Sequence, residues 1–408
     1  MKQGWEVKTL KEITTLLGDG LHGTPKYTVD GDYYFINGNN LTDGVIELKS
    51  STKRVSIDEY NQHKKNLTDR TVLVSINGTL GNVAFYNNEK IILGKSACYF
   101  NIKEHIDKNY IKHLLSSPYF LTYAHKEATG ATIKNVSLKT MREFIVPLPP
   151  LKEQQRIVAL LDEAFAAIAQ AKANAEQNLK NAKELFESYL QSVFENKGEG
   201  WEEKILSEIT NKIGSGATPR GGNESYKLEG ISLIRSMNVH DFEFRDKNLA
   251  FIDDQQAKLL NNVTIEENDV LLNITGASVA RCCVIPKKYL PARVNQHVSI
   301  IRAKKDIILP YFLSVLLTSK FYKKQLLFTG EQGATRQAIT KAQLEVFKVF
   351  FPSLQEQQTI VQKLDALSTE TKQLEAIYQQ KINDLDELKK SILQKAFAGE
   401  LNTTTLEV

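Results

Sequence analysis

Hydrophobic positions recur at steps of three and four along two long stretches of the chain. In residues 152–195 the series of apolar or alanine side chains begins at Ile157, and in residues 355–398 it begins at Ile360. Neither stretch contains glycine or proline. A single apolar stripe of this kind predicts a long amphipathic helix, and about 44 residues give a rod of roughly 65 Å. The positions expected to carry the stripe are Ile157, Leu161, Ile168, Ile360, Leu364 and Leu367.

Each of these helices needs a partner, because it cannot bury its stripe alone. The obvious partner is the other helix, and two helices that each follow an equivalent domain would pack antiparallel about a twofold axis. Asn178 and Lys381 stand at equivalent positions in the stripe. They either fix the register of the helix pair or face solvent, and the sequence leaves both possibilities open.

The stretches 1–150 and 200–350 have a different pattern, in which short β-type runs alternate with polar loops and one amphipathic helix is expected in each. Binding residues tend to collect on such loops. The runs in the first stretch are Tyr33–Asn37, Thr71–Ile76, Asn82–Tyr86 and Lys90–Leu93. Those in the second are Ser232–Ile234, Asp269–Ile274, Ala280–Ile285 and Val298–Arg302. The expected helices are Lys108–Ser116 and Pro310–Leu317.

The whole pattern is repeated. Residues 151–158 match residues 354–361, and Gly4-Trp5-Glu6 matches Gly200-Trp201-Glu202. Two copies of one unit can form a pseudo-dimer suited to a target with two similar halves, although duplication kept for stability alone is an alternative. We therefore expect an α+β protein with two similar domains, joined by two long helices packed as an antiparallel coiled coil with pseudo-twofold symmetry. The expected boundaries are 1–150 and 198–352 for the two domains, and 151–197 and 353–408 for the helices with the tail.

Charge follows the same division. The net charge is +4 for residues 1–150 and +5 for residues 200–350, but −2 for residues 151–199 and −3 for residues 351–408. Basic segments suit phosphate contacts and mildly acidic ones suit protein partners. The alternation supports a nucleic-acid partner for the two domains.

The three cysteines, Cys98 and the adjacent pair Cys282-Cys283, fit neither a disulfide framework nor a zinc site. They are expected to be small buried hydrophobes in a protein of the reducing cytoplasm. No apolar stretch approaches the roughly 20 residues that span a membrane.

The sequence contains no complete catalytic motif among those that can be recognised from sequence alone. Gly94-Lys95-Ser96 resembles the end of a phosphate-binding loop, but Glu89 occupies the position of the leading glycine. The seven histidines show no metal-ligand spacing. We expect no catalytic residue, no cofactor and no metal ion in this chain.

Several of these motifs resemble one known family. The segment Pro147–Ile157, repeated as Pro352–Ile360, resembles the entry to the conserved helices of type I restriction-modification specificity subunits, and Leu393–Leu401 resembles their usual end. Gly130-Ala131-Thr132 and Gly333–Gln337 resemble a Gly-small-Thr loop late in each target-recognition domain.

Two further blocks, Asp269–Leu271 and Asn295–His297, also match the family. The first domain departs from the pattern: Lys95-Ser96-Ala97 stands in place of Asn295–His297, and Ile133 in place of Arg336. Such differences are expected if the two domains read different bases. The resemblance covers essentially the whole chain.

The resemblance implies a sequence-specific DNA-binding subunit without an active site. Each domain would read one half of a split, asymmetric target in double-stranded DNA, and the helices would hold the halves apart. Two modification subunits carrying S-adenosylmethionine would dock and methylate adenines, and restriction subunits would complete an endonuclease. Two alternatives remain: a stand-alone nuclease or methyltransferase, and a coiled-coil scaffold that does not touch DNA.

Base edges and phosphates are bound by basic, amide and hydroxyl side chains on loops. For each candidate the alternative is a solvated loop residue or a plain phosphate contact, and Arg281 is expected within a strand in a structural role. The candidates in the first domain are Lys26, Asn37, Asn39, Asn77, Lys95 and Lys134. Those in the second are Arg220, Arg235, Asn238, Arg293, Gln296, Arg336 and Gln337.

Overall fold

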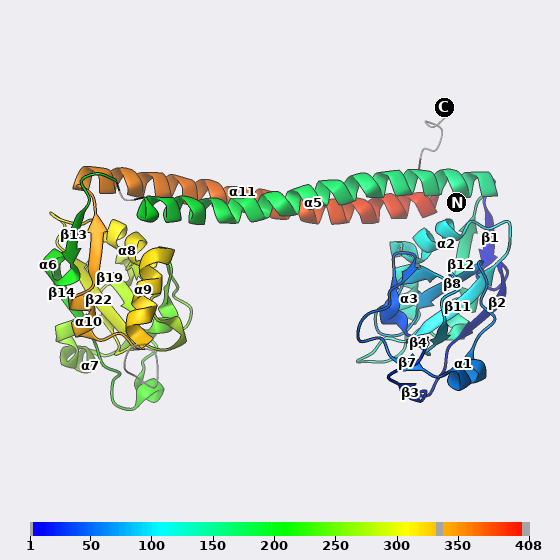
Figure 1. Ribbon diagram of the computed structural model, residues 1–408, viewed down its shortest axis with the longest axis horizontal. Coiled ribbons are helices and arrows are strands. Elements are labelled where there is room, and N and C mark those ends of the chain that lie inside the picture. The colour runs from blue at the N-terminus through cyan, green and yellow to red at the C-terminus, as the bar shows by residue number, and fades with distance from the viewer. Residues whose placement is uncertain (1–2, 197, 332–337, 402–408) are drawn as a thin grey trace. The chain divides into compact units, whose positions relative to one another are not determined.

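The computed structural model describes residues 3–196, 198–331 and 338–401. Its internal contacts divide the chain into two units (Figure 1). Unit 1 comprises Met1–Glu176 with Gln379–Val408, and unit 2 comprises Gln177–Tyr378. Each unit therefore contains one α+β domain and parts of both long helices.

The main sheet of unit 1 has four antiparallel strands in the order β2-β11-β8-β9 (Figure 1). Its central strand β8 (Thr71–Ser75) is buried along its whole length. Successive side chains of a strand point to opposite faces, and Val72 and Val74 lie in one hydrophobic core while Leu73 lies in another. The other strands are β2 (Thr14–Asp19), β9 (Val83–Phe85) and β11 (Ala97–Ile102).

Further elements surround this sheet. A second sheet has the order β10-β4-β7-β3, and β1 pairs with β12. Their strands are β1 (Glu6–Thr9), β3 (Tyr27–Thr28), β4 (Tyr33–Ile36), β7 (Arg54–Val55), β10 (Ile91–Leu93) and β12 (Ile145–Leu148), and a small hairpin joins β5 (Leu41–Thr42) and β6 (Val45–Ile46). The short helices are η1 (Gly38–Asn40), α1 (Ile57–His63), α2 (Lys108–Leu115), α3 (Pro118–Glu127) and α4 (Leu138–Glu143).

Unit 2 repeats this arrangement, with a main sheet in the order β14-β22-β19-β20 and a second sheet β18-β15-β21. The central strand β19 (Val270–Asn273) again separates two cores, because Val270 and Leu272 lie in one and Leu271 in the other. Its other strands are β13 (Glu202–Ile205), β14 (Thr210–Ser215), β15 (Ile231–Ile234), β16 (Val239–His240), β17 (Glu243–Phe244), β18 (Ala250–Ile252), β20 (Cys282–Val284), β21 (Ala292–Val294), β22 (Val298–Ala303) and β23 (Lys348–Phe351).

The helices of unit 2 are likewise short apart from those of the coiled coil. The α-helices are α6 (Leu206–Ile209), α7 (Asp254–Leu259), α8 (Pro310–Thr318), α9 (Lys320–Glu331) and α10 (Lys341–Glu345). The 3-10 turns are η2 (Gly222–Ser225), η3 (Ser236–Asn238), η4 (Asn261–Val263), η5 (Gly276–Ser278) and η6 (Lys287–Tyr289).

The two expected long helices are present as α5 (Leu151–Glu195) and α11 (Leu354–Ala398), each of 45 residues. In unit 1 the start of α5 and the end of α11 share one core, and Nζ of Lys172 lies 2.7 Å from Asp386. In unit 2 the end of α5 shares a core with the start of α11. The two helices therefore run antiparallel in each unit, as the repeat predicts.

The predicted stripe faces inward. Ile157, Leu161, Ile168, Ile360 and Leu364 are buried and Leu367 is half-buried. Asn178 and Lys381 are both exposed, which decides the open alternative in favour of solvent. These two polar residues therefore do not contribute to the packed seam.

The structure confirms the α+β class and every predicted β run, with boundaries shifted by a residue or two. The predicted helices at 108–116 and 310–317 are α2 and α8, but the sequence reading overlooked α3 and α9, which directly follow them. All three cysteines are buried and unpaired, and burial raises the pKa of each thiol. In the described residues, no helix combines the length and apolarity that crossing a bilayer requires.

Candidate nucleic-acid interface

At one end of the main sheet of unit 1, four loops meet and bring together candidates from distant parts of the sequence. Ser96, just before β11, accepts a hydrogen bond from the Gly38 amide (2.9 Å) and donates one to Oδ1 of Asn37 (2.9 Å). The amide of Ile76 at the end of β8 donates to the Ser96 carbonyl (3.0 Å). We call this region, formed by residues 37–40, 77–78, 95–96 and 129–135, the loop end of unit 1.

The last of these segments contains the Gly-Ala-Thr motif. Thr129 and Asn135 pair across it, so residues 130–134 project as an exposed loop. Nδ2 of Asn77 donates to Oδ1 of Asn135 (3.1 Å), and the Gly78 amide donates to the Lys134 carbonyl (2.9 Å). The motif is thereby fixed beside the turn that follows β8.

Unit 2 has an equivalent loop end, formed by residues 236–238, 275–278, 296–297 and 338–339. The amide of Ile274 donates to the His297 carbonyl (3.0 Å), and that of Ile339 to the Ile274 carbonyl (2.8 Å). Nδ2 of the buried Asn273 donates to the Ser236 carbonyl (2.9 Å). The Gly-Ala-Thr motif of this unit, and the candidates Arg336 and Gln337, lie outside the described residues.

These backbone bonds correct one correspondence between the repeats. The amides of Ile76 and Ile274 bond the carbonyls of Ser96 and His297, so Ser96 is the counterpart of His297. Asn295–His297 therefore corresponds to Gly94-Lys95-Ser96, one residue earlier than the sequence comparison placed it. Lys95 in unit 1 takes the place of Gln296 in unit 2.

The candidates differ in how free their side chains are. Lys26, Asn39, Lys95, Lys134, Arg220 and Gln296 are exposed. Asn37, Asn77 and Arg235 are half-buried. The Arg235 guanidinium donates to the Asn248 carbonyl and stacks over Tyr226, 5.2 Å from the ring centre. The structure brings Asn37, Asn39, Asn77, Lys95 and Lys134 together at the loop end of unit 1, whereas Lys26 lies outside the four segments that form it.

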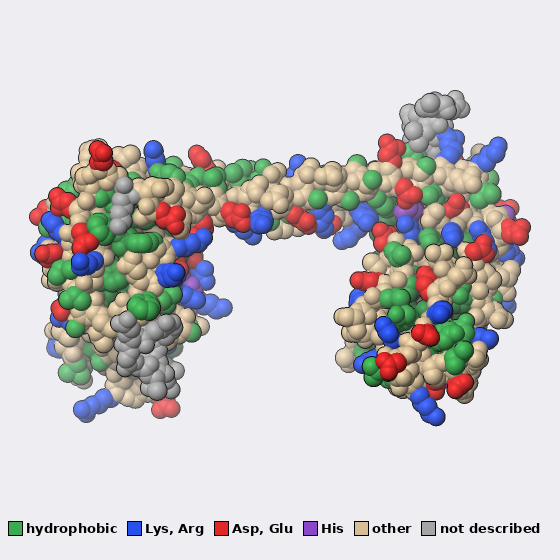
Figure 2. Space-filling model, in the orientation of Figure 1, with side chains coloured by type: hydrophobic (Ala, Val, Ile, Leu, Met, Phe, Trp, Pro, Cys, Tyr) green, Lys and Arg blue, Asp and Glu red, His purple; other side chains and the backbone are tan. Residues whose placement is uncertain are grey.

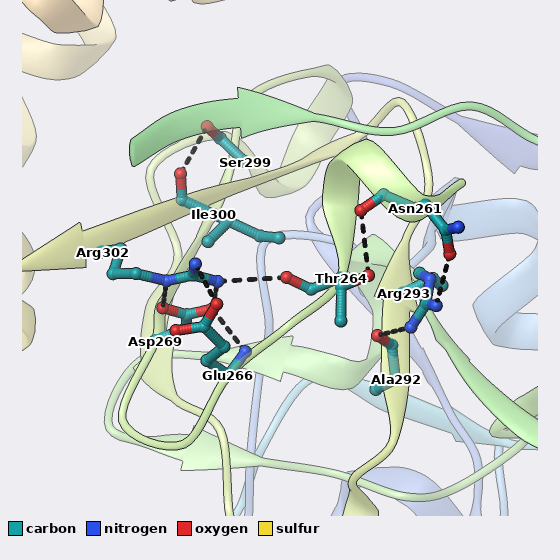
Figure 3. Close-up of polar contacts among 9 residues, drawn as sticks. All are labelled: Asn261, Thr264, Glu266, Asp269, Ala292, Arg293, Ser299, Ile300 and Arg302. Carbon is teal, nitrogen blue, oxygen red and sulfur yellow. Dashed lines mark hydrogen bonds and ion pairs between the residues drawn. The ribbon is translucent and has the colours of Figure 1, made fainter. Parts of the chain in front are cut away.

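Two candidates in unit 2 are held inside the domain. Asn238 is fully buried and its side chain donates to the Arg245 carbonyl (2.9 Å). Arg293 is only 8% exposed, and its guanidinium donates to the Ala292 carbonyl and to Oδ1 of Asn261, each at 3.0 Å (Figure 3). Desolvation by burial lowers the pKa of Arg293. Both side chains therefore bond groups inside the domain.

The family-like block at Asp269 is also structural. Asp269 is 1% exposed and accepts two hydrogen bonds of 2.8 Å from the Arg302 guanidinium, which also pairs with Glu266 (Figure 3). These bonds raise the pKa of Arg302. Because Asp269 precedes β19 while Thr275 follows it, this ion pair lies at the opposite end of the strand from the loop end.

Two polar side chains beside the loop end of unit 2 were not among the sequence-based candidates: Arg281, for which a structural role was expected, and His297. Arg281 lies just before β20 rather than within a strand, and together with Ser236, Thr275, Ser278 and His297 it lines an open cavity. His297 is half-buried, and its Nδ1 lies 2.6 Å from Oγ1 of Thr275. The sequence signals for His297 were its position beside Gln296 and its place in the family-like block Asn295–His297.

Basic and acidic side chains are not separated into patches on the face drawn in Figure 2. Figure 2 shows basic and acidic side chains mixed over the visible face of each unit. The loop ends are therefore distinguished by their clustered amide, hydroxyl and basic side chains, which are the groups that read base edges and phosphates.

The duplicated α+β domain with a polar loop end, followed each time by a long helix, defines a two-domain DNA-specificity protein. The chain belongs to the type I restriction modification DNA specificity domain family, whose model matches residues 2–181 and 198–384. It is 26% identical over 394 residues to the type I restriction enzyme EcoBI specificity subunit of Escherichia coli, an alignment that covers 89% of this chain and 81% of that subunit.

Two solved structures share the fold. One, described as the structural basis underlying complex assembly and conformational transition of the type I R-M system, has a TM-score of 0.72 and 20% identity, covering 98% of this chain and 99% of that one. The HsdS subunit from Thermoanaerobacter tengcongensis has a TM-score of 0.65 and 19% identity, covering 98% of both chains. The family match and the named relative make this chain a type I restriction-modification specificity subunit and disfavour the two alternatives.

Proposed function

We propose that this chain is the non-catalytic, DNA-reading subunit of a type I restriction-modification complex, and that each unit reads one half of a split, asymmetric target. The reading domains are residues 1–150 and 198–352, and the helical segments 151–197 and 353–408 serve as the spacer. Among the candidates, Asn37, Asn39, Asn77, Lys95, Lys134 and Gln296 act at the loop ends, and Lys26, Arg220 and Arg235 contribute from neighbouring surface. Arg336 and Gln337 belong to the same proposal.

The observation that carries this proposal is that one backbone scaffold presents different side chains in the two units. Asn77, Lys95 and Ser96 in unit 1 correspond to Thr275, Gln296 and His297 in unit 2. Donors and acceptors set which base edge a loop can bind in the major groove. Equivalent loops with different hydrogen-bonding groups therefore support two different half-sites.

Membership of the family supports the proposed partners. Modification subunits, two in number, dock on the chain and transfer the methyl groups, and restriction subunits join them to cut DNA. The faces of α5 and α11 that point away from the buried stripe are available for this docking, and the mildly acidic charge of both helical segments suits protein partners. Because such a complex acts on cellular DNA, we place the chain in the cytoplasm.

The test is reconstitution. The purified full chain is expected to bind duplex DNA and to transfer no methyl group from S-adenosylmethionine, whereas addition of a modification subunit restores methyl transfer. Binding should weaken steeply between about 50 and 200 mM salt, because phosphate contacts release counterions. Methyl transfer or DNA cleavage by the chain alone would mean an enzyme, and salt-independent or absent DNA binding would mean a scaffold. Either result overturns the proposal.

A further inference from the structure

A line of hydrogen bonds crosses three loops at the loop end of unit 2. Oγ1 of Thr218, in the loop after β14, bonds Oε1 of Gln296. Nε2 of Gln296 lies 3.1 Å from Nε2 of His297, and Nδ1 of His297 lies 2.6 Å from Oγ1 of Thr275. We call these four residues the relay.

The chemistry of the groups gives the relay a direction. A carbonyl oxygen can only accept, so Oε1 of Gln296 takes the hydrogen of the Thr218 hydroxyl. The amide nitrogen of Gln296 then donates to Nε2 of His297, which must be the unprotonated ring nitrogen. Nδ1 of the neutral imidazole therefore carries the hydrogen and donates it to Oγ1 of Thr275.

This direction determines what Thr275 can offer. Because its oxygen already accepts from His297, the hydroxyl hydrogen is left to donate elsewhere. No second hydrogen-bond partner for Oγ1 of Thr275 occurs among residues 3–196, 198–331 and 338–401. Thr275 instead lines the open cavity with Ser236, Ser278 and Arg281.

The rim of the cavity allows a ligand to approach closely. Gly276, directly after Thr275, has φ +75°, and a Cβ built on it would meet no atom within 4 Å. The glycine is therefore required by its backbone conformation, and the space above it is open. The exposed side chain of Met237 adds an apolar surface beside the polar groups.

We propose that the relay fixes the Thr275 hydroxyl as a hydrogen-bond donor that selects an acceptor atom on a base edge, with Gln296 and His297 as positioning residues. The acceptors that the major groove offers are N7 and O6 of guanine, N7 of adenine and O4 of thymine. This inference rests on the proposed function, because it assumes that unit 2 reads DNA at its loop end.

Unit 1 has no equivalent of the relay. Its counterpart of His297 is Ser96, which donates to Asn37, and its counterpart of Thr275 is Asn77, which donates to Asn135. A fixed hydroxyl donor should therefore select a base only in the half-site that unit 2 reads. The other half-site is an internal control for every variant of the relay.

The experiment selects preferred sites from a pool of randomised DNA duplexes, with the full chain in complex with a modification subunit. Thr275→Val keeps the shape of the side chain and removes the hydroxyl, whereas Thr275→Ser keeps the hydroxyl. We expect Thr275→Val to lower the preference at one base pair of one half-site by about five- to tenfold, the loss of a single hydrogen bond. Thr275→Ser should retain that preference, and the other half-site should be unchanged.

The positioning role is tested with His297→Ala and His297→Asn. Asparagine can place an amide N–H where Nδ1–H of the histidine was, so we expect His297→Ala to relax the same base pair as Thr275→Val and His297→Asn to restore part of the preference. Affinity for unrelated duplex DNA should stay the same in all variants, which a general loss of structure would not permit. Base analogues that lack one groove acceptor at that position should weaken wild-type binding and leave Thr275→Val unaffected.

The outcomes separate the two proposals. If the wild type selects no sequence, the proposed function fails. If the wild type selects a split site and Thr275→Val selects it with unchanged preference, the inference about Thr275 is overturned while the proposed function stands. If Thr275→Val relaxes the site but His297→Ala does not, the relay is not what positions the hydroxyl.

Discussion

Gln154 and Gln357, which are 203 positions apart in the chain, make the same two hydrogen bonds, each in its own unit. Gln154 donates from Nε2 to the Pro149 carbonyl (2.8 Å) and accepts from the Asp107 amide (2.9 Å). Gln357 donates to the Pro352 carbonyl (2.8 Å) and accepts from the Leu309 amide (2.8 Å). The most closely repeated motif of the sequence is therefore the joint that fastens each long helix to the domain before it.

Removing this joint should destabilise the unit that contains it. Gln154 is 1% exposed, and Gln154→Ala leaves the Asp107 amide and the Pro149 carbonyl without their partner. We expect a loss of about 2 kcal/mol in the free energy of unfolding, measured by urea denaturation, because buried polar groups without partners are costly. The exposed neighbour Gln155 supplies the control, and equal effects of Gln154→Ala and Gln155→Ala would contradict the assignment.

The end of α11 should prove essential to unit 1. Phe397 is 3% exposed and its ring centre lies 5.3 Å from that of Tyr110 in α2. Phe397→Ala should cost about 3–5 kcal/mol, because it opens a cavity in the core. Leu388, in the same helix, is 47% exposed, so Leu388→Ala should change the stability by less than about 0.5 kcal/mol. A calorimetric scan that shows similar melting temperatures for both variants would refute this role.

Stability should depend on pH through His113, a buried residue of α2 that contacts α5. Its Nε2 lies 2.8 Å from Asp162, but burial dominates and lowers its pKa below the ordinary value of 6.5. Below pH 6.5 the unfolded chain therefore binds a proton that the folded chain resists. The stability contributed by neutral, buried His113 is fully present above pH 6.5 and is lost as the pH falls through the lowered pKa of the folded state.

The measurement is the free energy of unfolding between about pH 5 and 8, the range in which an ordinary histidine titrates. His113→Asn should flatten the decrease on the acid side, whereas the same change at the exposed His105 should leave the decrease in place. Parallel pH profiles for the wild type and His113→Asn would show that another group is responsible.

The spacer role of the helices makes a geometric prediction that rests on the proposed function. Insertion of seven residues after both Gln177 and Gln380 keeps the heptad pattern and lengthens each helix by about 10 Å, or roughly three base pairs. The gap between the half-sites in the selected targets should grow by that amount, with the half-sites themselves unchanged. Selection of targets with the original gap would contradict the role of the helices as a spacer.

The local pattern of hydrophobic and polar residues was sufficient to predict most of the fold. The steps of three and four through Ile157 and Leu161 predicted helices that the structure contains, because a long stripe admits one interpretation. Helix α3 was overlooked because it follows α2 after only two residues, and its start is marked by Ser117 and Pro118 rather than by a clear apolar stripe. A break of two residues between α2 and α3 is too short to be recognised from the hydrophobic periodicity.

The site was less predictable, because its contacts join distant segments. Lys95 and Lys134 were found as polar loop residues, and the structure places both segments at one loop end. The burial of Arg293 depends on Asn261 and on the Ala257 carbonyl, which lie 32 and 36 positions away. Nothing in the residues beside Arg293 reports those partners. The same holds for His297, whose orientation depends on Thr275.

Two units with different loop ends should read two different half-sites. Sequencing the methylated positions in DNA exposed to the chain and its partner subunits tests it most directly, for the wild type and for the double variant Lys95→Ala/Lys134→Ala. We predict a split, asymmetric motif with a fixed gap, in which the double variant weakens or relaxes one half and leaves the other intact. A continuous or palindromic motif, or equal effects on both halves, would contradict the account.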